Sequence, residues 1–260
     1  MEGVVLFTPF FILVLPLISG KSIPPVEAIY PGLLIEVCGF GSATLGYHRQ
    51  KVIDYRASGY AMLWAVPFAV GVSLFAHRAP EGWLLFILGA ALLVMSALMY
   101  FAHRTPELGI PPEASPHGRR LEDSTGKVYA YNFRRIPLGA LISALGGVFV
   151  GFVGVGVGEF KTTYFILGQK MPARVSVASG VPVVMATVTA AVLARIVVTG
   201  SGMADFSVPW NIAAMCIPAV LIGGQIAPLI NRYLNPNRIK RILFVLFCVV
   251  GLILIFRGLF

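Results

Sequence analysis

Long apolar runs separated by short polar connections dominate the chain. They cover residues 3–19, 27–46, 57–76, 83–102, 137–154, 158–168, 175–199, 209–231 and 239–259. The hydrocarbon core of a bilayer is about 30 Å thick and takes about 20 apolar residues per helix, so most of these runs predict membrane-spanning helices. Strands of membrane barrels instead alternate apolar and polar residues. The pattern therefore predicts an all-α polytopic membrane protein with about nine helical segments.

A glycine-rich stretch interrupts this pattern near the middle of the chain. The sequence GVGVG, from Gly154 to Gly158, separates the run at 137–154 from the run at 158–168. An α-helix rises about 1.5 Å per residue, so the second of these runs would be only about 16 Å long. It would reach about halfway across a bilayer. We therefore predict a broken half-helix at the glycine stretch.

Basic residues are distributed unevenly between alternate connections, and this predicts an orientation. One set of connections holds 15 Lys and Arg residues, whereas the other set, with the tail, holds three. Cytoplasmic loops carry the excess of Lys and Arg in membrane proteins. We therefore expect a multi-pass protein of the cytoplasmic membrane with the N-terminus inside and the C-terminus outside. This orientation places residues 107–134 inside and 199–207 outside, provided that the two runs flanking the glycine stretch form a down-and-up pair.

The two halves of the chain show a weak internal repeat. The segment Gly20–Gly32 aligns without a gap on Gly168–Gly180 at a shift of 148 positions. Asp54 matches Asp205 at a shift of 151. These matches predict two repeats of four segments with an additional helix between them. The four segments of the first repeat and the additional helix together make an odd number of membrane crossings, so the second repeat has the inverted orientation. Transporters use such inverted repeats to place a site at the midplane, although short Gly and Pro matches also arise by chance in apolar sequence.

The repeat and the polar connections divide the chain into four predicted parts. The hydrophilic stretch after the fourth run contains four prolines and residues of both charges. Such a composition predicts a solvated linker without a folded domain. The predicted parts are a first membrane repeat at 1–102, a cytoplasmic linker at 103–136, an additional linking helix at 137–157 and a second membrane repeat at 158–260.

Composition excludes several other classes of protein. Hydrophobic residues make up 57% of the chain and charged residues 12%, which excludes a soluble or disordered chain. The net charge of +9 comes largely from basic loops beside apolar runs, so we do not expect nucleic-acid binding. Cys38, Cys216 and Cys248 lie in apolar runs, and the histidines lie in connections without ligand spacing. We therefore expect no disulfide framework, metal site or cofactor.

The glycine stretch is the main candidate for a binding site. Gly154, Gly156 and Gly158 allow close approach to the backbone, and the start of a helix offers N–H groups and a positive dipole end to an anion. The repeat pairs this region with a predicted helix start at Thr8 and Pro9, which would supply a second positive end.

Close helix packing is the alternative role for these glycines. The series Gly147, Gly151 and Gly154 has the spacing of small residues at helix interfaces. Both roles are compatible, because the earlier glycines can pack while the later ones bind.

Two charged residues follow the glycine stretch. Lys161 lies one turn into the predicted half-helix, where a charge is costly and is usually functional or paired. We expect Lys161 to add positive potential to the anion site. The alternatives are a local pair with Glu159 or extension of the side chain toward the outer surface.

Other polar residues within the apolar runs are further candidates. Glu36 must be paired, protonated or exposed to water at its depth, so it is a candidate for proton coupling, for pairing with Lys161 or for a structural hydrogen bond. Glu159 is a second candidate for proton coupling. Ser179 is expected to begin its helix and could donate to an oxyanion, or else bond its own backbone. Arg195 is expected to extend to the outer end of its helix.

Several of these segments resemble a known family of transporters. The sequences GGVFVGFVGVGVGEF and FILGQKMPARVSVASG resemble the glycine-rich half-helix and the following helix start of the sulfite exporter TauE/SafE family. The segment GLLIEVCGFGSATLGYHRQKVIDYR is similar to the corresponding helix and connection in the first half of some members. Two features depart from the family pattern: the first half starts at MEGVVLFTP without a glycine-rich element, and EFK follows the second glycine cluster. The resemblance implies export or import of small sulfur-containing anions.

We therefore expect a secondary transporter that works by alternating access and is not an enzyme. Its expected partners are the lipid bilayer, a sulfur-containing anion such as sulfite, thiosulfate or an organosulfonate, and a proton as candidate coupling ion. One alternative is an intramembrane enzyme that acts on a lipid or small anionic substrate with Glu36 or Glu159 as acid or base. Another is a structural or accessory subunit. The sequence leaves the direction of transport and the oligomeric state open.

Overall fold

Helices form most of the described chain, at the positions that the apolar runs predict. The computed structural model describes residues 4–19, 24–103, 118–134, 136–202, 210–230 and 236–259. The first run forms α1 (Val4–Pro9), a π-helix (Phe10–Val14) and α2 (Leu15–Ser19) in succession. The later runs form α3 (Pro25–Arg49), α4 (Tyr55–Phe75) with a short 3-10 helix (Ala76–Arg78), α5 (Glu81–His103), α6 (Pro137–Val153), α7 (Val157–Leu167), α8 (Ala173–Gly200), α9 (Trp210–Ile230) and α10 (Pro236–Leu259). The predicted helical segments are therefore confirmed.

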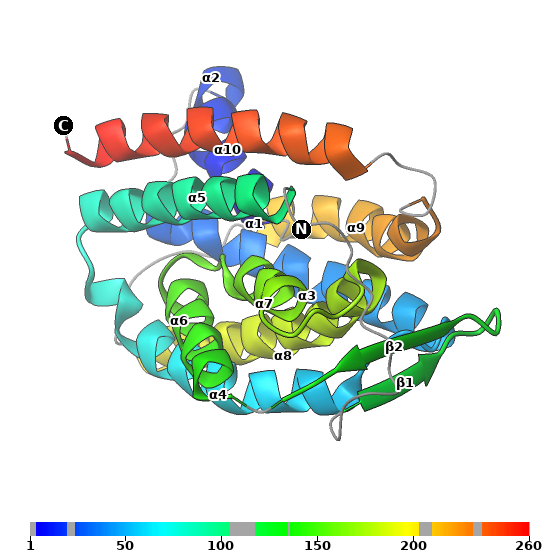
Figure 1. The fold of residues 1–260 in the computed structure, drawn as a ribbon. Helices are drawn as coiled ribbons and strands as arrows, with labels where there is room; N and C mark the ends of the chain where they lie inside the picture. The colour runs from blue at the N-terminus through cyan, green and yellow to red at the C-terminus, as the bar shows by residue number, and fades with distance from the viewer. Residues whose placement is uncertain are drawn as a thin grey trace.

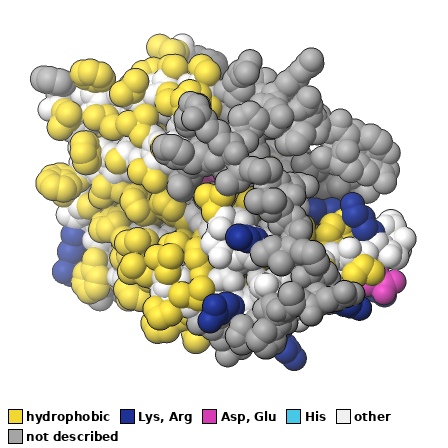
Figure 2. Space-filling view, in the orientation of Figure 1, with side chains coloured by type: hydrophobic (Ala, Val, Ile, Leu, Met, Phe, Trp, Pro, Cys, Tyr) yellow, Lys and Arg dark blue, Asp and Glu magenta, His cyan; other side chains and the backbone are white. Residues whose placement is uncertain are grey.

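Several helices have the length and composition needed to cross a membrane. Among the described residues, three are both long and apolar enough: Glu27–Arg49, Tyr55–Arg78 and Ala173–Gly200. Shorter apolar helical stretches lie at Phe7–Leu17, Glu81–Ala97, Pro137–Val153, Ala214–Ile226 and Phe244–Leu259. Figure 2 shows hydrophobic side chains over a broad part of one face, and many large apolar side chains are exposed. An exterior of this kind is suited to contact with lipid.

The helices pack in pairs that bring distant parts of the chain together. α5 lies along α10, α3 contacts both α8 and α9, and α4 contacts both α6 and α8. Figure 1 shows α5 and α10 on one side of the molecule and α4, α6 and α8 on the opposite side, with α3 and α9 between them. The α5–α10 pair is antiparallel, because Gly82 faces Gly258 and Gly89 faces Gly251. These small residues let the two backbones approach closely.

Small residues also join α4 to α6. α4 buries alanines at every fourth position from Ala57 to Ala69, which places them on one face of the helix. On α6, a Cβ atom at Gly147 would clash with Ala65 O, and one at Gly151 would lie 2.9 Å from Ala69 O. Such contacts leave no room for a side chain. The predicted packing role of the two earlier glycines is therefore confirmed.

The first helical segment differs from the predicted helix start at Thr8 and Pro9. α1 already begins at Val4, so both residues lie inside a helical segment. Pro9 has no N–H to donate, and the helix widens directly after it into the π-helix Phe10–Val14. The prediction of a second positive helix end at Thr8 is therefore wrong.

The polar linker contains a β-hairpin that the sequence analysis did not predict. β1 (Gly118–Glu122) and β2 (Val128–Asn132) pair in antiparallel orientation. Asp123 organises the turn, because its Oδ1 accepts hydrogen bonds from the N–H and the hydroxyl of Thr125. The expectation of an all-α chain is corrected accordingly, because the linker, which was expected to be solvated without a folded domain, contributes this pair of strands. The preceding residues 104–117 lie outside the described residues.

The hairpin covers one end of the helical bundle. Alternate residues of a strand share a face, and on β2 the buried residues are Tyr129 and Tyr131. Both pack in a hydrophobic cluster with Tyr47 of α3, Phe165 of α7 and Met171 just before α8. Figure 1 shows the hairpin beside the ends of these helices. We call this region, comprising the hairpin, the α3–α4 connection and the first two turns of α8, the hairpin end.

Candidate functional site

A break between α6 and α7 forms the centre of the candidate site. Gly154 follows the last residue of α6 in the left-handed conformation with a φ of 81°, and Gly156 before α7 has a φ of 128°. Residues with a Cβ rarely adopt either conformation. A Cβ atom at Gly156 would also lie 3.1 Å from Phe149 Cβ. The backbone path through the break therefore requires glycine at these two positions.

From this break, α7 runs back along α6. A Cβ atom at Gly146 would lie 2.9 Å from Val157 Cα, and one at Gly139 would lie 2.9 Å from the ring of Tyr164. The two helices are thus antiparallel, and the first residues of α7 lie beside the middle of α6. Val155 and Val157 are fully buried. The break and the short second helix are present as predicted, and the positive dipole end of α7 lies inside the bundle.

The first turn of α7 faces α8. A Cβ atom at Gly180 of α8 would lie 2.9 Å from Thr162 Oγ1 and 4.0 Å from Gly158 O. The absence of a side chain at Gly180 therefore lets α8 approach the start of α7. The structure thus brings the predicted residues Gly154, Gly156 and Gly158 into one region and adds Gly180 to it.

Lys161 is fully buried and points toward the beginning of α6. Its Nζ donates hydrogen bonds to Gly139 O at 3.1 Å and to Ser143 Oγ at 2.8 Å. Nζ also lies 5.0 Å from the ring centroids of Tyr164 and Phe165, and such cation–π contacts contribute about 2 kcal/mol to a desolvated cation. The ammonium is therefore directed away from the first residue of α7. Extension of the side chain to the outer surface, one of the alternatives, is wrong.

Arg195 of α8 stabilises the other end of α6. Its Nη2 donates hydrogen bonds to Gly151 O at 2.8 Å and to Phe152 O at 2.9 Å. The last carbonyl groups of a helix lack intrahelical partners and carry the negative dipole end, so a cation is favoured there. The side chain is 4% exposed, and its Cζ lies 6.0 Å from the ring centroid of Tyr30. The expectation that Arg195 extends to the outer end of its helix is therefore wrong.

Three more predicted site residues are buried within the bundle. Glu36 of α3 is 2% exposed, and Glu159 in the first turn of α7 is 9% exposed. Thr8 is fully buried, and its Oγ1 has no hydrogen-bond partner among the described residues. A buried hydroxyl without a partner costs free energy. The roles of the two acids in proton coupling and of Thr8 in binding stay predictions.

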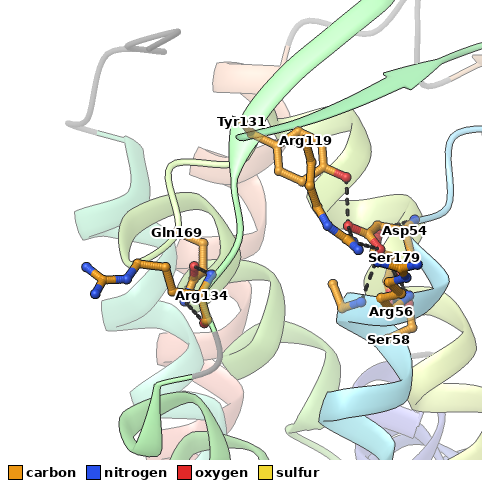
Figure 3. A network of polar contacts seen from close by, with 9 residues as sticks. Asp54, Arg56, Ser58, Arg119, Tyr131, Arg134, Gln169 and Ser179 are labelled. Atoms are coloured by element: carbon orange, nitrogen blue, oxygen red, sulfur yellow. Dashed lines mark hydrogen bonds and ion pairs between the residues drawn. The ribbon is translucent and has the colours of Figure 1, made fainter. Parts of the chain in front are cut away.

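A second polar cluster, which the sequence analysis did not assign to a site, lies at the hairpin end. Asp54 is the N-cap of α4, and its Oδ1 accepts a hydrogen bond from the N–H of Ala57. The same carboxylate accepts hydrogen bonds from Arg119 of β1 at 2.6 Å and from Tyr131 Oη of β2 at 2.8 Å. The Asp54 N–H donates to Ser179 Oγ of α8 at 2.9 Å. Figure 3 shows these groups converging on Asp54 from three parts of the chain.

The carboxyl group of Asp54 is ionised in this cluster. Burial alone would raise its pKa, but the hydrogen bonds from Arg119, Tyr131 and the N–H of Ala57 outweigh burial and lower the pKa below its usual value. Burial and the neighbouring Asp54 carboxylate raise the pKa of Tyr131, so its phenol keeps the proton that it donates. The ion pair between Asp54 and Arg119 therefore persists at neutral pH.

Ser179 belongs to this cluster through its observed contacts. α8 begins at Ala173 after the N-cap Pro172, so Ser179 lies in the second turn, and the expectation that it begins its helix is wrong. Its Oγ accepts the hydrogen bond from Asp54, and its carbonyl oxygen accepts one of 2.7 Å from Ser58 Oγ. Donation from Ser179 to a bound anion stays a prediction.

The turn of the hairpin is attached to the end of α3 and to the start of α8. Asp123 Oδ2 forms an ion pair of 3.2 Å with Arg174 in the first turn of α8. Arg174 also donates to Gln50 Oε1, and the N–H of Ser124 donates to Gln50 O at 2.9 Å. The hairpin is therefore held at both of its ends on the α3–α4 connection and on α8.

Only part of this second cluster had a signal in the sequence. Asp54 directly before an apolar run is a typical N-cap. Arg119 and Tyr131 pair with Asp54 across 65 and 77 positions, and no local pattern predicts such contacts.

Comparisons with known proteins agree with the resemblance seen in the sequence. The family model described as sulfite exporter TauE/SafE matches residues 3–254. The "Probable membrane transporter protein YunE" of Bacillus subtilis (strain 168) is 24% identical over 245 residues, which are 92% of this chain and 84% of that protein. No solved structure matches the chain.

Proposed function

Since the chain belongs to the sulfite exporter TauE/SafE family, we propose that it is a secondary transporter that moves a small sulfur-containing anion across the cytoplasmic membrane. The family and the relative support membrane transport, and their names indicate a transporter and not an enzyme. Sulfite, thiosulfate and organosulfonates are the proposed substrates. They share compact, negatively charged oxygen groups.

The observation that carries this proposal is the helix break inside the bundle. Nonhelical backbone at membrane depth is tolerated where it is buried in protein or lines a watery cavity, and the break at Gly154 and Gly156 is buried. The positive end of α7 begins there and attracts an anion. Lys161, buried one turn further along α7, adds positive charge near this end. The absence of a side chain at Gly180 brings α8 close to the start of α7, so the proposed site lies between these two helices.

The helix packing supports the proposed inverted repeats. In the repeat, α3 corresponds to α8 and α4 to α9, so the α3–α9 contact is equivalent to the α4–α8 contact, and both pairs of helices pack together. The helix starts also correspond: Pro24 and Pro172, at the shift of 148, are N-caps with φ of −56° and −54°. Gly20 and Asp205 of the sequence match lie outside the described residues. We propose that the two repeats move relative to each other during alternating access.

The hairpin end is cytoplasmic in this proposal. Arg119, Arg120 and Arg174 lie there, and cytoplasmic segments of membrane proteins are enriched in such residues. The N-terminus is then inside and the C-terminus outside. Glu36 and Glu159 are the proposed proton-coupling groups, because both are buried acids.

Uptake by proteoliposomes tests the proposal. Sulfite, thiosulfate, sulfate and sulfoacetate should each be offered with and without a pH gradient across the membrane. We expect saturable uptake of at least one sulfur anion that exceeds uptake by protein-free liposomes. Dependence on the pH gradient would support proton coupling. Absence of saturable uptake for all four anions would contradict the proposed function.

A further inference from the structure

The contacts at the hairpin end join the two proposed repeats directly. Asp54 and Ser58 belong to α4 and its N-cap in the first repeat, whereas Ser179 belongs to α8 in the second. The Asp54 N–H donates to Ser179 Oγ, and Ser58 Oγ donates to Ser179 O. These bonds span 125 and 121 positions of the chain. Relative motion of α4 and α8 at this end would have to break both of them.

The hairpin adds contacts from a segment that belongs to neither repeat. Arg119 and Tyr131 bind the Asp54 carboxylate from above, as Figure 3 shows. Near the turn, Asp123 pairs with Arg174 of α8. The hairpin therefore bridges the start of α4 and the start of α8.

The chemistry of these contacts differs from that of the contacts between α4 and α6. Toward α6, α4 presents alanines in backbone contact with glycines such as Gly147, and separation there would expose apolar surface to water. Toward α8 at the hairpin end, α4 and its N-cap present the N–H of Asp54 and the hydroxyl of Ser58. When such polar contacts break, water can form hydrogen bonds with the separated groups, so separating α4 from α8 here costs little net free energy. The Arg119 side chain is already 24% exposed, and its partner Asp54 is 5% exposed.

We propose that Asp54, Arg119, Tyr131 and Ser179 form a gate that closes the transport pathway at the hairpin end. In the closed state, the hydrogen bonds to Ser179 hold α4 directly against α8. The hairpin strengthens this contact, because it binds Asp54 through Arg119 and Tyr131 and binds α8 through the ion pair of Asp123 with Arg174. The contacts to Ser179 break when the repeats separate there. α4 remains packed on α6 throughout. The gate rests on the proposed transport function, since a gate has a role only in a protein that alternates between open states.

Thiol labelling tests the gate without any substrate. In a variant whose three native cysteines are replaced by alanine, Ser58→Cys places a thiol at a position that is 1% exposed and lies beside Ser179 in the closed gate. We expect Arg119→Gln to increase its rate of reaction with a small hydrophilic maleimide by about 10-fold or more, because a charged hydrogen bond is lost. Arg120→Gln is the matched control, since it removes the same charge from an exposed position on the same strand. Equal rates in the two variants would overturn the gate.

Two checks separate gate opening from general unfolding. Arg119→Lys keeps the charge but loses the planar fork of donors, so its labelling rate should lie between those of wild type and Arg119→Gln. The thermal midpoint of each variant should be measured in the same detergent. A rate increase that occurs only in variants already unfolded at the labelling temperature would also overturn the gate.

A reversible crosslink tests its role in flux. Ser58→Cys combined with Ser179→Cys places two thiols on α4 and α8 where the native side chain and backbone are in contact. We expect oxidation of this pair to abolish anion transport and reduction to restore it, with no effect of either treatment on the single variants. Full transport by the crosslinked protein would overturn the gate while leaving the proposed function intact. If wild type transports none of the four anions, the proposed function fails, and the labelling rates still decide whether the contacts open.

Discussion

Lys161 donates a hydrogen bond of 2.8 Å to Ser143 Oγ and thereby ties the half-helix α7 to the beginning of α6. This contact holds the ammonium toward the beginning of α6, where Gly139 O accepts a second hydrogen bond from Nζ and Gly139 faces the ring of Tyr164. In the proposed site, Lys161 would therefore act on an anion at the break through its electrostatic potential. A direct hydrogen bond from Lys161 to the anion would require its side chain to turn.

The first prediction concerns the charge of Lys161. We expect Lys161→Met to weaken anion binding by about tenfold, because a buried charge acts over several ångströms in a medium of low dielectric constant. Lys161→Arg keeps the charge and should retain most of the affinity. Ser143→Ala removes only the hydroxyl partner and should lower stability more than affinity. Binding should be measured by calorimetry on purified protein, and unchanged affinity of Lys161→Met would remove Lys161 from the site.

The second prediction concerns the backbone at Gly156. Its φ of 128° is strained for any residue with a Cβ, so Gly156→Ala should destabilise the protein by about 1–3 kcal/mol and disturb the break. Gly71→Ala is the matched control, because a Cβ atom there meets nothing within 4 Å inside a regular helix. That control should be neutral or stabilising by up to about 1 kcal/mol. Unfolding in detergent and anion uptake measure the two effects, and equal behaviour of the two variants would contradict the strained break.

The third prediction concerns the pH dependence that Asp54 confers. Its folded-state pKa lies below the usual value, so its stabilising contribution is fully present above the unfolded pKa of about 3.9 and is lost as the pH falls through the folded pKa. We expect this contribution to be constant from neutral pH down to about pH 5. Asp54→Asn should lower the thermal midpoint at pH 7 and lose less stability on acidification than wild type. A parallel decline of both proteins would show that folding does not lower the pKa of Asp54.

The fourth prediction concerns orientation. Ser124 in the hairpin turn and Ser201 after α8 are both exposed. A membrane-impermeant thiol reagent added to intact cells should modify Ser201→Cys and should leave Ser124→Cys unmodified until the cells are opened. The reverse pattern would invert the proposed topology.

The sequence predicts the helices of this protein well, because apolar run length is set by the thickness of the bilayer. The runs at 137–154 and 158–168 correspond closely to α6 and α7. The glycine stretch also predicts the break, since Gly154 and Gly156 adopt conformations that other residues avoid.

The hairpin was missed for a physical reason that particular residues make clear. Prolines in the first part of the linker indicate irregular chain, but the later segment has a turn at Asp123 and alternating residues around Tyr129 and Tyr131. Its stability comes from burial of these tyrosines against helices distant in sequence. Arg195 illustrates the same limit, because the carbonyl groups that hold it belong to α6, 44 positions earlier in the case of Gly151. Long-range partners of this kind leave no periodic signal.

Counterflow in proteoliposomes tests the central claim most directly, because it requires a carrier that alternates between two sides and binds a sulfur anion on each. Vesicles should be loaded with a high concentration of unlabelled thiosulfate or sulfite and diluted into a trace of the same anion labelled with radioactive sulfur. We predict a transient accumulation of label above its external concentration, which is absent from vesicles loaded with chloride and reduced by Gly156→Ala. Failure of every tested sulfur anion to accumulate would contradict carrier transport. Equal uptake into loaded and chloride-filled vesicles would contradict alternating access.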